Sequence, residues 1–461
     1  MTEGNSEKTT ATCTQGQGEA LSGLDRIREA ARRDKSIRFN NLMHHITIDL
    51  LRESYGQLNP KAKPGIDGVT HGQYGKKLEE NLSDLHERVK SGRYRATPSK
   101  RVWIPKADGS KRPIGILCLE DKVVQQAVAT VLNQIYEEDF LGFSYGFRPE
   151  HSPHNALDAV SVGITQRKVN WILDADIRSF FDTVDHEWQM KFVEHRIADK
   201  RILRLIRKWL KAGVFADGKR VAQTKGTPQG SVISPLLANI YLHYTFDLWA
   251  NQWRKKQATG DVIMVRYADD IVMGFQNKAE AESFLQALQK RFNKFGLELH
   301  QDKTRLIEFG RFAIENRASR GLGKPETFDF LGFTHICAET RKGNRFVVRR
   351  KTIKKRLRNK IAEVKEELYR RKHDPVPEQG KWVCSAVNGY FNYAAVPYNK
   401  ESVDVFRTEV IKSWRAALRS RSQKARKLNW ERFGRLIKTW VPTTKVRHPH
   451  PNQRLCVTNP R

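Results

Sequence analysis

Short apolar runs that end in acidic residues are the most informative pattern in this chain. Residues Val262–Phe275 have the sequence VIMVRYADDIVMGF, in which two apolar stretches of strand length flank Tyr267–Asp270. Because β-branched residues are frequent and Arg266 is the single charge within the flanks, the pattern predicts a β-hairpin. Its tip would carry two adjacent carboxylates, which are costly at the end of a rigid apolar element unless a cation binds them. The hairpin alone fits a divalent metal site and a solvated Asp-Asp turn equally well.

A second apolar run that meets acids lies at Trp171–Asp185 (WILDADIRSFFDTVD). Asp174 and Asp176 alternate with apolar residues, so both carboxylates fall on one face of a predicted strand, and a helix is expected soon after it. A carboxylate from this separate segment would complete a three-carboxylate site with Asp269 and Asp270. The spacing does not distinguish Asp174 from Asp176 as the third ligand.

The remaining periodicity predicts a chain of mixed helices and strands. Apolar steps of three and four residues favour helices, and Gly and Pro mark the breaks between them. A strand interrupted by a glycine is expected at Thr327–Phe333. The predicted helices lie within residues 24–55, 71–90, 120–132, 236–253, 279–295 and 353–368.

Two further segments suit phosphate groups without requiring them. Residues 101–116 contain two short strands around an Asp-Gly turn, with cations near the tip of the resulting hairpin. By itself this pattern favours an ordinary solvated hairpin. Residues 226–235 form a Gly-rich loop before an apolar helix, and such a loop can present backbone N–H groups to a nucleotide, although similar loops precede many helices. The cations near the hairpin tip are Lys106, Lys111 and Arg112.

The net charge says more about the binding partner of this chain than the rest of its composition does. The 461 residues include 83 Lys and Arg against 51 Asp and Glu, a net charge of +32, which favours a polyanionic partner. A membrane surface is the alternative, but no apolar run approaches the length of a membrane span and the polar N-terminus does not resemble a signal peptide. The five cysteines are scattered and lack zinc-finger spacing, so we expect reduced thiols in a cytoplasmic protein.

The positive charge is concentrated after residue 340. Residues 341–461 hold 32 Lys and Arg and 9 Asp and Glu, a net of +23, whereas the first 340 residues carry only +9. This step predicts a near-balanced enzyme body followed by a binding module, with a boundary near residues 336–345. The helix within 353–368 has an opposite face of almost one sign, which favours phosphate contacts over a merely solvated face. Aromatics interleaved with cations, such as Tyr390, suit RNA as much as core packing.

Taken together and in order, these segments resemble the successive motifs of reverse transcriptases. Three additional motifs are similar to those of the group II intron-encoded reverse transcriptase/maturase subgroup, and the resemblance spans roughly residues 24–440. The general motifs are Lys106–Arg112, Asp174–Asp182, Thr227–Pro235 and Tyr267–Asp270. Those of the subgroup are Ser144–Pro149 (SYGFRP), Phe330–Phe333 (FLGF) and Val387–Pro397 (VNGYFNYAAVP), with the Lys303 segment in addition.

The resemblance implies an α+β fold of the right-hand polymerase type. Fingers and a palm with an antiparallel sheet would be followed by an α-helical thumb, also called maturase domain X. The expected regions are a disordered tail at 1–22, an N-terminal extension of the fingers at 23–95, fingers and palm at 96–338, thumb and domain X at 339–442, and a basic tail at 443–461.

The resemblance also assigns roles to individual residues. It selects Asp176 over Asp174, so the catalytic carboxylates would be those of Asp176, Asp269 and Asp270. The metal-binding residues would be Asp176, Ile177, Asp269 and Asp270, holding two Mg²⁺ ions or Mn²⁺ in their place. Lys303 matches a proposed proton donor to pyrophosphate, and Phe181 an aromatic that disfavours a 2′-OH. The nucleotide-binding residues would be Lys106, Arg112, Phe181, Gln229 and Lys303. RNA contacts are expected at Lys351, Lys354, Lys355, Arg358 and Tyr390.

The function implied is an RNA-directed DNA polymerase that copies RNA into cDNA, binds its group II intron RNA, and assists splicing and retrohoming. Its partners would be that RNA, a DNA target or primer, and dNTPs, with no membrane partner, in a bacterial cytoplasm and associated with the nucleoid through the intron ribonucleoprotein. Two alternatives stay open: a splicing factor on an inactive polymerase scaffold, and a reverse transcriptase recruited to defence or DNA repair. Because Cys456 stands alone and His448 and His450 lie in a Pro-rich segment, no HNH-type endonuclease is expected, and the primer would be made elsewhere.

Overall fold

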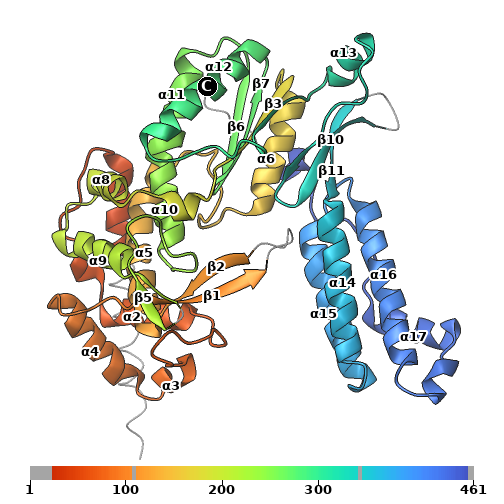
Figure 1. Ribbon diagram of the computed structural model, residues 1–461, viewed down its shortest axis with the longest axis horizontal. Coiled ribbons are helices and arrows are strands. Elements are labelled where there is room, and N and C mark those ends of the chain that lie inside the picture. Colours follow the sequence, from red (N-terminus) through yellow and green to blue (C-terminus); the bar gives the residue numbers. More distant parts are fainter. Residues whose placement is uncertain (1–22, 106–110, 217, 341–344, 455–461) are drawn as a thin grey trace, which may run out of the picture.

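The N-terminal part of the protein combines helices with a small sheet. The computed structural model describes residues 23–105, 111–216, 218–340 and 345–454 (Figure 1). Strands β1 and β2 form the predicted hairpin, and β1 also pairs in parallel with β4, which gives the sheet order β2-β1-β4-β5. The elements up to this sheet are a helix over residues 23–33, η1 (Met43–His45), α2 (Ile48–Gln57), α3 (His71–Gly75), α4 (Leu78–Lys90), β1 (Ser99–Pro105), β2 (Lys111–Ile116), β4 (Val214–Ala216) and β5 (Lys219–Val221).

A four-stranded antiparallel sheet lies at the centre of the molecule, in the order β6-β7-β3-β8. The sequence alternates because the two faces of this sheet are covered by different helices. One face packs on α6, where Ile172 and Val272 join one apolar cluster, and the other contributes Leu173 and Met273 to the main core. The strands are β3 (Trp171–Asp176), β6 (Val262–Tyr267), β7 (Asp270–Phe275) and β8 (Arg305–Glu308), which confirms the two strands predicted to meet acids.

Helices that precede, separate and follow the strands of this sheet in the sequence enclose its core. The predicted helix within residues 236–253 is interrupted, because one turn of π-helix, η2, lies between α10 and α11. Likewise, the chain after β3 forms two helices instead of one, since Asp185 caps a new helix at Glu187 and Trp188. These elements are α5 (Leu119–Asp139), α6 (Pro153–Gln166), α7 (Phe180–Thr183), α8 (His186–Arg196), α9 (Lys200–Lys211), α10 (Ser234–Leu242), η2 (His243–Asp247), α11 (Leu248–Lys256) and α12 (Lys278–Lys294).

A third sheet leads from the central sheet to the C-terminal helices. Its order is β11-β10-β9, and Leu331 and Gly332 form the turn between β9 and β10, at the predicted glycine break. The boundary predicted near residues 336–345 falls at this hairpin: β10 extends to Glu339 and pairs with β11, and the first C-terminal helix begins at Lys354. The elements here are α13 (Ala313–Ser319), β9 (Phe328–Phe330), β10 (Phe333–Glu339) and β11 (Phe346–Thr352).

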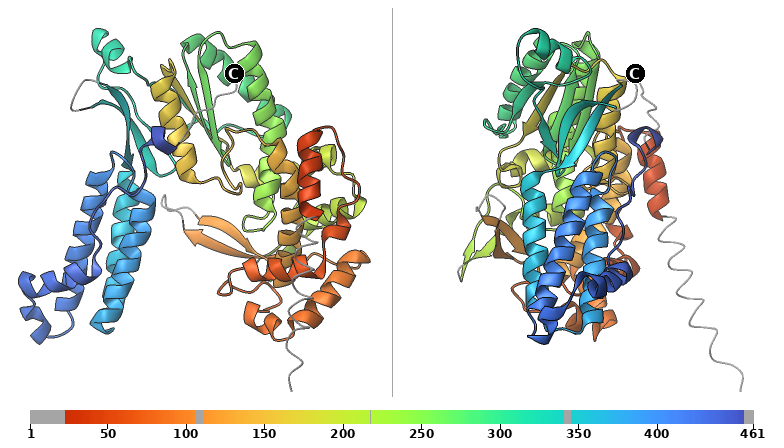
Figure 2. Two further views of the ribbon diagram at one scale, coloured as in Figure 1. Left: turned by 180° about the vertical axis from the view of Figure 1, so that it is seen from behind. Right: turned by 90° about the vertical axis from the view of Figure 1, so that its right-hand side faces the viewer.

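The C-terminal helices have an apolar core of their own and extend away from the central sheet (Figures 1 and 2). Trp414 is fully buried there, and its indole N–H donates to Gln379 at 3.1 Å. None of the helices in the described parts of the chain combines the length and the apolar composition that a membrane crossing requires. The helices are α14 (Lys354–Arg370), α15 (Val376–Ala394), α16 (Lys400–Arg419), η3 (Lys424–Lys427) and α17 (Trp430–Trp440).

After α17 the chain runs back to the central sheet. Residues 442–454, the return segment, end in the short helix α18 (Pro451–Arg454), which packs on α6. The His448 ring stacks on His154 of α6 at 3.9 Å, and Arg454 pairs with the buried Asp158 of α6 at 3.1 Å. Arg350 of β11 donates to the same Asp158 carboxylate at 2.7 Å. One buried carboxylate therefore joins α6, the third sheet and the return segment.

Candidate active site

Strand pairing brings together carboxylates that are about 90 residues apart in the sequence. Asp176 at the end of β3 is the register partner of Asp270 at the start of β7, and Asp174 pairs with Val272 further along the same strands. Asp174 and Asp176 share one face, as predicted, because Leu173 and Ala175 point into the core. Tyr267 and Asp270 close the β6–β7 hairpin, so Asp269 lies in its turn.

The donors around this turn are suited to a divalent cation that also binds substrate phosphates. Mg²⁺ usually takes one or two carboxylates and completes its octahedral shell with phosphate oxygens and water. Among the described residues, no group of three or more His, Cys, Asp or Glu side chains converges closely enough to hold a metal ion by itself. Lys303 Nζ instead donates to Asp176 Oδ2 at 2.8 Å. The carboxylates therefore fit a metal that arrives with a triphosphate better than a closed protein cage.

Crowding of negative charge makes this site costly without a cation. Burial raises the pKa of Asp174 to about 7; Arg305 lowers it in part, and the charges of Asp270 and Asp176 add to the rise. Asp270 itself is exposed to solvent on one side, yet the protein around it displaces enough water to raise its pKa to about 7, with Asp269 and Asp176 contributing next. Burial also raises the pKa of Asp269. Carboxylates perturbed in this way are typical of functional sites.

Cations from three separate elements oppose this negative charge. Arg112 of β2 and Lys303 lie close enough to Asp269 to lower its pKa, against the effect of burial. Arg356 of α14 acts on Asp270 in the same direction. Arg356 Nη1 lies against the β9–β10 turn, 2.7 Å from where a Cβ on Gly332 would be, and the φ of +84° at Gly332 favours glycine there. The C-terminal helices thus contribute a cation to the carboxylate site.

The Gly-rich loop lies between the β1–β2 hairpin and α7. Gly115 N–H donates to the Gln229 carbonyl at 2.6 Å, and Thr227 N–H donates to the Phe181 carbonyl at 2.7 Å. The Phe181 ring contacts Phe180 and Phe147 edge to face. Val232 and Ile233 N–H groups both donate to the Gln125 side chain. Several of the loop amides that the sequence suggested for nucleotide binding are therefore engaged within the protein, and the loop is bonded to Gly115 through Gln229 and to Phe181 through Thr227.

Comparison with known proteins agrees with this geometry. Residues 104–335 match the family model described as reverse transcriptase (RNA-dependent DNA polymerase). Protein YkfC of Escherichia coli is 34% identical over 310 residues, which cover 59% of this chain and 81% of that protein. The chain belongs to the reverse transcriptase family. RNA-directed DNA polymerisation is the activity of this family, and its members generally use divalent metal ions.

Other relatives of this reverse transcriptase are intron-encoded. Group II intron-encoded protein LtrA of Lactococcus lactis is 33% identical over 222 residues, which cover 48% of this chain but 37% of LtrA. A protein in the cob intron of Schizosaccharomyces pombe is 34% identical over 238 residues, or 50% of this chain and 29% of the relative. The expected resemblance to group II intron reverse transcriptase/maturases is confirmed, although the chain spans little more than a third of LtrA.

Three of the expected RNA contacts of the reverse transcriptase share one surface, and two do not. Lys354, Lys355 and Arg358 are exposed on α14. Lys351 is on β11 and pairs with Glu401 at 2.8 Å. Of the two interpretations left open for Tyr390, the structure shows packing: its half-buried ring stacks on Phe406 at 3.8 Å between α15 and α16.

The two other expected residues are Lys106 and Ile177, and the sequence did not single out Arg356. Lys106 lies outside the described residues. Ile177 is buried and bridges to Leu299, which fixes the backbone directly after Asp176. The sequence indicated Arg356 only as one of the cations on the helix predicted within residues 353–368. Its approach to Asp270 depends on how α14 meets the β9–β10 turn, a long-range contact that no local pattern encodes.

Proposed function

We propose that this reverse transcriptase copies RNA into DNA by two-metal nucleotidyl transfer, with Asp176, Asp269 and Asp270 as the metal ligands. The observation that carries the proposal is the pairing of Asp176 with Asp270 beside the Asp269 turn, with Arg112, Lys303 and Arg356 around it. Mg²⁺ held there would activate the primer 3′-oxygen and neutralise the leaving oxygen.

The residues around the carboxylates have separate tasks in this proposal. Arg112, from the β1–β2 hairpin, and Lys303 offset the charge of the incoming triphosphate. Lys303 also pairs with Asp176 at 2.8 Å, and a metal ion there would compete with that pair and release the ammonium group toward pyrophosphate. Phe181 and Gln229 line the sugar and base side of the nucleotide, with Phe181 excluding a 2′-hydroxyl.

The test is primer extension on an RNA template by the Asp269→Ala variant. Thermal unfolding checks that the variant is folded. In the folded variant we expect primer extension to be lost, because one of the metal ligands has been removed. Asp182→Asn, an exposed carboxylate on α7, serves as the matched control and should extend normally. Unchanged cDNA synthesis by Asp269→Ala would rule out the assignment of the active site.

We further propose that the protein binds a group II intron RNA and assists its splicing, with right-hand organisation into fingers, palm and thumb. The names of LtrA and of the intron relatives support this, as does the net charge of +23 in residues 341–461. The measurement is affinity for the intron RNA against random RNA over a range of salt. Equal affinity for both RNAs at every salt concentration would leave a polymerase without a maturase role.

A further inference from the structure

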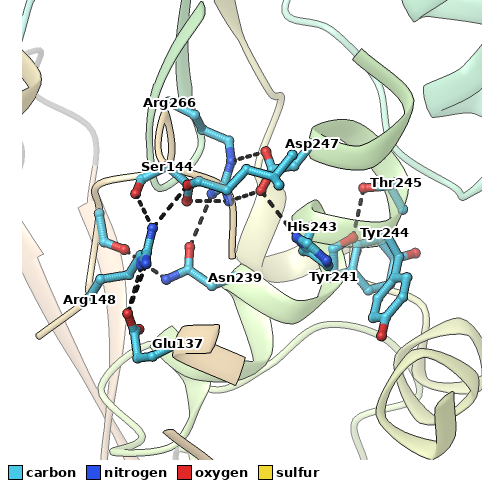
Figure 3. Close-up of polar contacts among 12 residues, drawn as sticks. Glu137, Ser144, Arg148, Asn239, Tyr241, His243, Tyr244, Thr245, Asp247 and Arg266 are labelled. Carbon is cyan, nitrogen blue, oxygen red and sulfur yellow. Dashed lines mark hydrogen bonds and ion pairs between the residues drawn. The ribbon is translucent and has the colours of Figure 1, made fainter. Parts of the chain in front are cut away.

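Arg266 is a buried charge directly before the turn that carries Asp269. It lies on β6, in an otherwise apolar stretch, and is fully buried. Its guanidinium has five N–H donors, and all five are used. Nε and Nη2 donate to the two Asp247 oxygens at 2.7 and 2.5 Å, and Nη2 also donates to Ser144 Oγ at 2.6 Å. Nη1 donates to Asn239 Oδ1 at 3.0 Å (Figure 3). It also donates to the Ala268 carbonyl at 3.1 Å.

The partners of Arg266 come from segments that the fold brings together behind the turn. Asp247 ends the π-helical turn η2, and a π turn changes the direction in which later side chains of a helix point. Asn239 of α10 also donates to the Gly146 carbonyl at 2.7 Å. The Arg266 backbone pairs with the segment around Ser144, since Arg266 N–H donates to Phe143 O and Tyr145 N–H donates to Arg266 O, both at 2.8 Å.

The turn itself has a backbone conformation that needs support. Ala268 has φ of +56°, in the left-handed region that residues with a Cβ rarely adopt. Its carbonyl is the group that Arg266 Nη1 binds. On the other side, Gly146 packs so closely that a Cβ there would lie 2.2 Å from the Ala268 nitrogen. Asp269 is the next residue, so its position depends on how Ala268 is held.

We propose that Arg266 is a positioning residue, which fixes the Ala268 turn from behind and thereby presents Asp269 and Asp270; this rests on the proposed function of those carboxylates. Asp247 on η2 holds the guanidinium in place. Stability alone gives no reason for a charged pair here, because buried ion pairs contribute little compared with apolar residues of similar size.

The experiment compares Arg266→Lys with Arg196→Lys, a matched control. Arg196 is equally buried and pairs with Asp139 at 2.9 Å, but its other hydrogen-bond partners are the backbone carbonyls of Asp34, Lys35 and Ile37. Lysine keeps the charge but cannot make five directed hydrogen bonds. For single-nucleotide addition on an RNA template, we expect Arg266→Lys to lower kcat about 100-fold, as a misplacement of about 1 Å can do, with KM for dNTP changed less than about threefold.

Arg196→Lys should lower the thermal midpoint and leave kcat near the wild-type value below that midpoint. If Arg266→Lys shows the same behaviour as Arg196→Lys, the positioning role is wrong. Asp269→Ala separates this result from failure of the proposed function, since loss of extension in Asp269→Ala with normal kcat in Arg266→Lys overturns only the positioning role.

A second pair of variants decides the matter if Arg266→Lys does not fold. Gly146→Ala inserts a methyl group against the Ala268 nitrogen, whereas a Cβ on Gly142, in the same segment, has no atom within 4 Å. We expect Gly146→Ala to lower kcat by at least about tenfold with KM for dNTP unchanged, and Gly142→Ala to behave as the wild type. Equal kcat in both glycine variants would overturn the proposal.

Discussion

Asp174→Asn should stabilise the metal-free protein, and more strongly as the pH rises. Asp174 lies on the same strand face as Asp176, its side chain is 21% exposed, and Arg305 is 3.8 Å away. Its pKa is about 7 in the folded protein against the ordinary 3.8, chiefly because of burial. A difference of this size corresponds to on the order of 4 kcal/mol of folding free energy lost when the carboxyl is fully ionised.

The sign follows from proton binding. Between pH 4 and pH 7 the folded protein binds more protons at Asp174 than the unfolded chain does, so its contribution to stability is complete below pH 3.8 and is lost as the pH rises through 7. Asparagine does not titrate. We therefore expect the variant to gain little stability over the wild type at pH 4 and on the order of 4 kcal/mol at pH 8.

The assay is urea unfolding followed by tryptophan fluorescence, in the presence of a chelator, from pH 4 to pH 8. Asp302→Asn is the control, because Asp302 is an exposed carboxylate in the turn before Lys303. The variant and wild-type stabilities should diverge with pH, and the control should follow the wild type. Parallel curves for Asp174→Asn and wild type would refute the inference that burial raises this pKa.

The remaining predictions concern selectivity, RNA contacts and the return segment. Phe181→Val should raise the kcat/KM ratio of rNTP to dNTP about 10-fold or more in single-nucleotide addition, and an unchanged ratio would exclude Phe181 as the sugar contact. Replacing Lys354, Lys355 and Arg358 with Gln should reduce the slope of log affinity against log salt for RNA by about 2 to 3, whereas Tyr390→Phe should leave it unchanged; equal slopes would exclude the α14 surface. Asp158→Ala should lower the unfolding free energy by about 3–5 kcal/mol, because it leaves Arg350 buried without a partner; a loss below about 1 kcal/mol would contradict this.

Local patterns predicted the elements that carry the carboxylates. The alternation in Val262–Phe275 depends only on which side chains face the two packed layers, so it specifies the hairpin directly. The same reasoning placed Asp174 and Asp176 on one face. It could not choose between them, because the choice depends on register: Asp176 is opposite Asp270, and Asp174 is opposite Val272.

Features that depend on distant contacts were not visible in the sequence. Arg266 was visible as a charge in an apolar strand, but its partner Asp247 lies on a π-helical turn that the hydrophobic periodicity did not predict. For Tyr390 the sequence left RNA binding and core packing open, because its stacking on Phe406 depends on how α15 meets α16. The rise in positive charge after residue 340 is a property of composition, and it does not reveal that β10 and β11 pair through backbone hydrogen bonds.

The return segment gives the C-terminal helices a further point of attachment. They leave the third sheet where β11 continues into α14, and the chain comes back to α6 through His448 and Arg454. Along the way Arg447 also bonds to Asn388 of α15 at 2.6 Å. Tyr393 of α15 adds further contacts, since its hydroxyl donates to the Leu331 carbonyl at 2.6 Å and its carbonyl lies 2.9 Å from His154 Nε2. Attachment at several places therefore opposes any swing of these helices that would carry Arg356 away from Asp270.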